Sequence, residues 1–141
     1  MTEIHIKKYI RYFFGVSILL FVLNKLYLRP WVIENELSGF VLMVTNSIPN
    51  LLEAIIGTLI TTGILLQLHF YFTKTRTHKN LPIRIFAVVI AAIYVISQEI
   101  KFHNLGGNNV YDPFDLIASV IGLVGTFMII QLFGFVDDPK D

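Results

Sequence analysis

The chain has 141 residues, of which 55% are hydrophobic and only 15% are charged, and its mean hydropathy is +0.67. Soluble domains contain about 45–50% apolar and about 25% charged residues, so this composition excludes an ordinary soluble domain and indicates a membrane protein. The formal net charge of +1 is uninformative by itself, and we expect no nucleic-acid partner. The absence of cysteine excludes disulfides, thiolate metal sites and cysteine nucleophiles.

Four apolar runs are each long enough to cross a hydrocarbon core about 30 Å thick, which takes about 20 helical residues. The runs are predicted at residues 8–28, 49–72, 81–102 and 113–136. Little chain is left for a soluble domain. We therefore predict an all-α, polytopic membrane protein in which residues 1–141 form a single domain, a four-transmembrane-helix bundle.

The first run follows a basic start, which it shares with cleaved signal peptides. It lacks a small-residue cleavage site and ends in a polar and aromatic group at residues 24–31, so we interpret it as a retained span. Pro30 is expected to end the helix, because proline is unfavourable in a helix interior.

The connection at residues 34–47 carries apolar side chains at helical spacing. They recur at i, i+3, i+4 and i+7, namely Leu37, Phe40, Val41 and Val44. This pattern predicts a short amphipathic helix at the outer interface. The second span would then begin with Ser47 as N-cap and Pro49 in the first turn, which places Glu53 only about 6 Å inside the helix.

The last two spans begin with similar local signals. Pro82 lies in the first turn of the third span, whose strong polar residues, Gln98 and Glu99, are at its far end. Asp112 is predicted to cap the fourth helix, with Pro113 at the first helical position.

The basic residues predict the orientation in the membrane. The side that holds both termini collects eight of the eleven: Lys7, Lys8, Arg11, Lys74, Arg76, Lys79, Arg84 and Lys140. Cytoplasmic loops carry an excess of Lys and Arg, so we expect both termini in the cytoplasm of a plasma-membrane protein. The polar stretch at residues 98–122 would then lie at the outer face.

Helical periodicity predicts that charged and small side chains converge there. Asp115, Ser119, Gly122 and Thr126 fall on one face of the fourth helix, and small residues let membrane helices approach closely. Lys25 and Arg29 supply cations at the same depth. The predicted ligand-binding residues are Lys25, Arg29, Glu53, Glu99, Asp112, Asp115 and Ser119.

The order Glu99, Asp112, Asp115, Ser119 and Gly122 resembles the motif of the VanZ-like family of small four-span membrane proteins. The chain departs from the family motif at two positions. Ser119 stands where the family usually has Asn, and the Arg that the family usually has shortly before the first Asp is missing, since Val110 and Tyr111 precede Asp112. The resemblance covers the second half of the chain. It implies a single VanZ-like domain in a bacterial cell envelope, related to resistance to teicoplanin-type glycopeptide antibiotics, and no defined reaction.

Three functions are compatible with these residues. The one that fits best is an outer-face binding module for an envelope glycolipid or peptidoglycan precursor, whose anionic groups would meet Lys25, Arg29 and Lys101. The second is an enzyme acting on a lipid-linked phosphate substrate, with Glu99 or Asp115 as acid or base. The third is a small dimeric transporter, against which the lack of charge in the central stretches counts.

Two further interpretations concern the same acids. Glu99, Asp112, Asp115 and His103 offer ligands for Mg²⁺ or Zn²⁺ but match no recognised spacing, so we expect no metal or other cofactor. Structural ion pairing is the alternative to a ligand-binding role for the acids. Membrane lipids are expected partners in every case, and a homodimer is compatible with all three functions.

Overall fold

The computed structural model describes residues 4–74, 80–100 and 112–137. Its elements are α1 (Lys8–Leu23), the π turn η1 (Asn24–Leu28), α2 (Arg29–Glu34), α3 (Gly39–Thr73), α4 (Leu81–Glu99) and α5 (Pro113–Phe133). α1, η1 and α2 follow one another without a break and form one candidate span, Lys8–Glu34. With α3, α4 and α5, the described residues contain four helices long and apolar enough to cross a membrane, which confirms the predicted all-α bundle.

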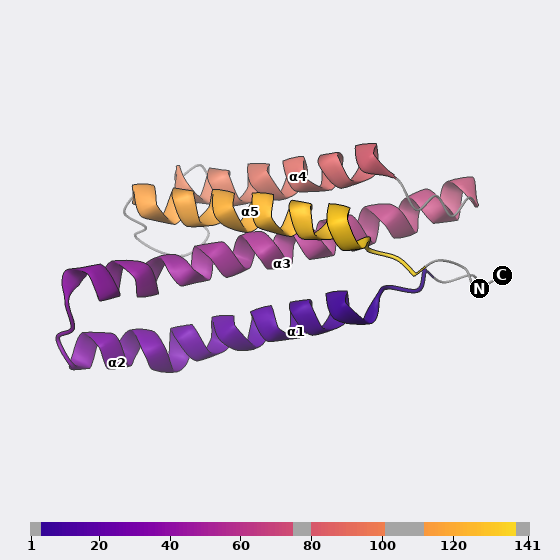
Figure 1. Ribbon diagram of the computed structural model, residues 1–141. Helices are drawn as coiled ribbons and strands as arrows, with labels where there is room; N and C mark the ends of the chain where they lie inside the picture. Colours follow the sequence, from indigo (N-terminus) through magenta and orange to yellow (C-terminus); the bar gives the residue numbers. More distant parts are fainter. Residues whose placement is uncertain (1–3, 75–79, 101–111, 138–141) are drawn as a thin grey trace.

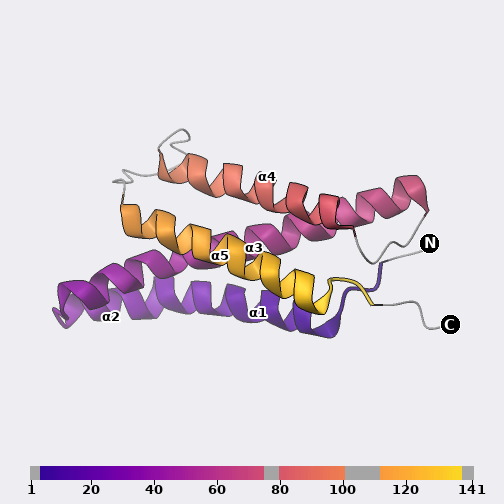
Figure 2. The ribbon, with the colours of Figure 1, turned by 45° about the horizontal axis from the view of Figure 1, so that its top comes forward.

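The other helices pack around α3 (Figure 1). α3 contacts the first span, α4 and α5, and α4 and α5 also contact each other. The two ends of the described chain lie at the same end of the bundle, where Ile6 and Val136 form an antiparallel bridge (Figure 2). We call this the termini end. The opposite end, which holds the turn at residues 35–38, Glu99 and Asp112, is called the far end.

α3 and α5 approach each other closely at Gly122. A Cβ atom at Gly122 would lie 2.6 Å from the carbonyl oxygen of Leu51 and 2.9 Å from Cβ of Ala54. The two backbones therefore meet directly at this point, as small residues allow in membrane bundles. Leu123, Ala91 and other apolar side chains pack around the contact.

Donors from other elements bind the last carbonyl groups of α5 at the termini end. The Lys7 ammonium donates to the carbonyl oxygen of Phe133 at 2.7 Å, and the Tyr9 hydroxyl donates to that of Gly134. Arg84, which is buried, donates to the carbonyl oxygen of Ile130 at 3.3 Å and to the side-chain oxygen of Gln131 at 2.6 Å. The bond from Lys7 satisfies the Phe133 carbonyl group, which the end of the helix leaves without a helical partner, and the cations of Lys7 and Arg84 suit the negative end of the helix dipole.

The prediction that Pro30 ends the first helix is wrong. The helix continues to Glu34, and Pro30 occupies the first turn of α2, directly after the π turn η1. In that turn the Arg29 N–H donates to the carbonyl oxygen of Asn24, five residues back. A π turn is wider than an α turn, so it makes room for a proline that lacks an N–H and crowds the preceding carbonyl group.

The predicted interfacial helix at residues 34–47 is also not a separate element. Residues 39–47 form the first turns of α3, a continuous helix of 35 residues and hence about 52 Å. Ser47 is therefore not an N-cap, and Pro49 lies inside the helix. The Ser47 hydroxyl oxygen lies 3.1 Å from the carbonyl oxygen of Met43, one turn back in the same helix. The apolar side chain of Phe40 stays exposed on this extension.

The starts of the last two helices are confirmed. Pro82 lies in the first turn of α4, and the Asp112 carboxylate caps α5 by accepting from the Phe114 N–H at 2.9 Å. α5 ends at Phe133, earlier than the predicted residue 136, because Gly134 adopts a φ of 75°, which favours glycine. α4 ends at Glu99.

Candidate functional site

The four spans each bring a charged side chain toward the far end of the bundle. Glu99 interacts electrostatically with Asp115, Glu53 and Asp112, and Glu53 interacts with Lys25. We call Glu53, Glu99, Asp112 and Asp115 the carboxyl cluster. Its members come from α3, the end of α4 and the start of α5, and Lys25 comes from η1 of the first span.

Asp115 and Asp112 are held by hydrogen bonds at the start of α5. The Ser47 hydroxyl donates to the Asp115 carboxylate at 2.8 Å, which ties the first turn of α5 to α3. A carboxylate in the first turn of a helix is also favoured by the helix dipole. Asp112 uses one carboxylate oxygen to cap the helix, so part of its role is structural.

Glu99 and Ser119 complete the wall of the cluster on α4 and α5. Glu99 is half-buried at the last residue of α4. Ser119, one turn below Asp115, is fully buried, and its hydroxyl has no hydrogen-bond partner among the described residues. An unpaired buried hydroxyl costs free energy unless another group supplies a bond.

Glu53 lies deeper than the sequence analysis predicted. It is fourteen residues after Gly39, about 21 Å along α3 rather than about 6 Å, because α3 begins ten residues earlier than expected. Relative to Ser47, whose hydroxyl reaches Asp115, it lies about 9 Å further into the bundle. Glu53 nevertheless belongs to the carboxyl cluster, because it interacts electrostatically with Glu99 and Lys25.

The two predicted cations differ in their surroundings. Both Lys25 and Arg29 are exposed, and the Lys25 ammonium lies 5.8 Å from the centre of the Phe21 ring. Lys25 interacts with Glu53, whereas Arg29 begins α2, about one turn nearer the far end. The cluster has four carboxyl groups, and Lys25, which interacts with Glu53, is its one cationic partner among these interactions, so acidic groups are in excess.

Sequence reasoning missed Ser47 as a partner of the cluster. The signal was present, since Ser47, Ala54, Thr58 and Thr62 repeat at helical spacing and are buried on one face of α3. A different face of α3, which carries Gly57 and Thr61, meets α4, where the Thr61 hydroxyl lies 3.2 Å from the carbonyl oxygen of Ala87.

The described residues contain no group of three His, Asp or Glu side chains placed to hold a metal ion. Two residues of the sequence predictions, the metal-ligand candidate His103 and the cation Lys101, lie outside the described residues.

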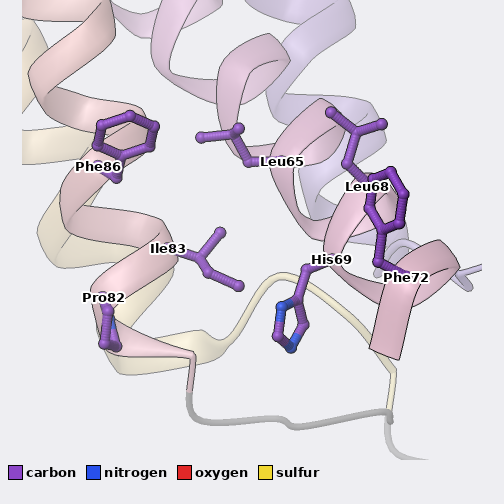
Figure 3. A pocket seen from close by; sticks show the side chains of 7 residues that line it. All are labelled: Leu65, Leu68, His69, Phe72, Pro82, Ile83 and Phe86. Carbon is purple, nitrogen blue, oxygen red and sulfur yellow. The ribbon is translucent and has the colours of Figure 1, made fainter. Parts of the chain in front are cut away.

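A hollow lies at the termini end, between α3 and α4. It has a volume of about 320 Å³, and Figure 3 shows the His69 imidazole between the two helices with Ile83 and Pro82 opposite. The other lining side chains are apolar, among them Leu65 and Phe86. Because His69 is the one ionisable side chain in its lining, the hollow offers less chemistry than the carboxyl cluster does.

The far end therefore combines carboxyl groups, a lysine and hydroxyl groups in the wall of a helix bundle, an arrangement suited to holding the charged head of an amphiphile. The chain matches no family model, no curated protein and no solved structure.

Proposed function

We propose that the protein is a binding protein of the bacterial plasma membrane, whose far end holds an amphiphilic envelope molecule at the outer face. The observation that supports this is the convergence of charged side chains from all four spans. An envelope glycolipid or peptidoglycan precursor has the required form, with a polar head and a chain that stays in lipid. The resemblance of Glu99, Asp112, Asp115 and Gly122 to the VanZ-like motif adds a link to glycopeptide susceptibility.

The charges of the site support a head group that carries both signs of charge. The carboxyl cluster has more acidic groups than Lys25 alone balances, so a ligand ammonium group placed near it would relieve the repulsion. Phosphate or carboxylate groups of the same head would face Lys25 and the exposed Arg29. We therefore propose a ligand that carries phosphate together with at least one amino group.

The first prediction concerns orientation, for which we propose that the termini end faces the cytoplasm. Ser38 and Asp137 are exposed at opposite ends of the bundle, and the chain contains no cysteine of its own. In intact cells an impermeant maleimide should label Ser38→Cys, whereas Asp137→Cys should react only after lysis. The reverse pattern would place the far end in the cytoplasm and remove the outer-face site.

The second prediction concerns Arg29. The probes are phosphatidylglycerol, which carries phosphate alone, and its lysyl ester, which adds amino groups. Arg29→Ala should weaken retention of both by about three- to tenfold, because a charge-assisted hydrogen bond is lost at an exposed and partly screened position. Native mass spectrometry of the gently solubilised protein measures retention.

The matched control is Arg11→Ala. Arg11 is also an exposed arginine of the first span, but it lies near the termini end. It should retain both probes as the unaltered protein does. Equal losses in the two variants would mean that the lipids respond to general surface charge, and the proposed site would have no ligand of this kind.

A further inference from the structure

A long apolar groove runs between the first span and α3 in the half of the bundle nearer the far end. Its volume is about 680 Å³. Leu23, Leu28 and Trp31 line it from the first span, and Ile48 and Leu52 line it from α3. η1 and α2, the part of the first span nearer the far end, contact α3 but neither α4 nor α5 (Figure 1). The volume and the mostly apolar lining suit an acyl chain.

Asn24 is the polar exception in this lining. Its side chain is 2% exposed, and neither its amide nitrogen nor its amide oxygen has a hydrogen-bond partner among the described residues. A buried amide without partners costs free energy, and the cost is greater in a bilayer, where water is scarce. Asn24 also begins the π turn η1, a deviation from α-helical geometry that is frequent at functional sites.

The depth of Asn24 indicates which part of an amphiphile would meet it. Asn24 lines the groove together with Ile48 and Leu52, which follow Ser47 by one and five residues. Ser47 is level with the first turn of α5 through its bond to Asp115. The Asn24 amide thus lies within about 8 Å below the level of Asp115 and next to Lys25 in the chain, where the head of a bound amphiphile would join its acyl chain.

We propose that this groove holds the acyl chain of the ligand and that Asn24 binds a secondary amide or hydroxyl group at the junction of head and chain. An Asn amide offers both a donor and an acceptor, so its full complement is a group with both functions. An ester offers only acceptors and would leave the Asn24 oxygen unpaired. The inference rests on the proposed function, in which an amphiphile occupies the far end, and adds that its chain is amide-linked or hydroxylated.

Trp31 makes a direct test available, because it lines the groove and is the only tryptophan in the chain. The probes are the N-methyl amide and the methyl ester of the same dibromostearic acid, whose bromine atoms quench tryptophan fluorescence. In vesicles of phosphatidylcholine containing the protein, the amide should reach half-maximal quenching at a mole fraction about three- to tenfold lower than the ester, the effect of one hydrogen bond. Equal quenching by the two probes would overturn the proposal without requiring any variant.

Two variants test the role of Asn24. Asn24→Leu keeps the side-chain size, so quenching by the amide should fall to the ester value, and without probe the melting temperature should rise because an unpaired polar group is removed. The control is Asn46→Leu. Asn46 also has a side-chain oxygen without a partner among the described residues, but it does not line the groove, so the preference for the amide should persist.

The outcomes also separate this inference from the proposed function. Both probes are uncharged, so they do not depend on Lys25, Arg29 or the carboxyl cluster. If amide and ester quench alike while Arg29→Ala still weakens retention of phosphatidylglycerol, the charged site stands and the role given to Asn24 is wrong. A lower melting temperature for Asn24→Leu would show that Asn24 supports the fold and would likewise reject its role as a ligand contact.

Discussion

Gly122→Ala should destabilise the bundle by about 1–3 kcal/mol or more, the cost of overpacking a close contact. The added methyl group would lie 2.6 Å from the Leu51 carbonyl oxygen, which belongs to backbone and cannot turn aside as a side chain would. α3 and α5 would have to separate along their shared interface, where Ser119 and Thr126 are also buried. Thermal unfolding in detergent, followed by circular dichroism, measures the loss.

Gly125→Ala is the matched control for this prediction. It adds the same methyl group to the same helix one turn further on, at a position with nothing within 4 Å of the new atom. Replacing a glycine inside a helix by alanine favours the helix by about 0.5–1 kcal/mol, so this variant should unfold at the same temperature as the unaltered protein or higher. Equal destabilisation by the two substitutions would mean that α3 and α5 do not meet at Gly122.

The helices that could be predicted best are those whose limits depend on local chemistry. Asp112 and Pro113 start α5 as expected, because a carboxylate cap and a proline without an N–H act within one turn of the chain. Pro30 and Pro49 carry the same local signal but lie within continuous helical segments. Membrane helices tolerate internal proline when the surroundings accommodate the backbone, and a π turn such as η1 has no recognised sequence signature.

In the candidate site, too, some contacts could be predicted from the sequence and others could not. That Glu99 and Asp115 approach each other could be inferred, because helical periodicity fixes which side chains share a face. The bond from Ser47 to Asp115 and the depth of Glu53 could not, since both depend on where α3 begins. An error in one helix start thus changed the expected position of every side chain measured from it.

Glu99→Gln and Asp115→Asn should each abolish the preference of the protein for the lysyl ester of phosphatidylglycerol over phosphatidylglycerol itself. Each change keeps the shape of the side chain and removes one negative charge from the carboxyl cluster. Because a bonded ion pair contributes about 1.5–3 kcal/mol, the preference should fall by about tenfold or more. Competition between the two lipids, followed by native mass spectrometry, measures this preference. The control is Thr126→Ala, which lies deeper in the bundle and should leave the preference nearly unchanged.

The folded protein should survive both changes, and this separates ligand binding from structural ion pairing. In Asp115→Asn the new side chain can still accept the Ser47 hydroxyl through its amide oxygen, so the link between α3 and α5 is kept. Losing the favourable charge at the start of α5 costs about 0.3–1 kcal/mol, which is offset by weaker repulsion from Glu99. Unchanged melting with lost preference supports the binding role. If both variants melt several degrees lower and bind the two lipids as before, the acids serve the fold, and the far end does not recognise an amino group.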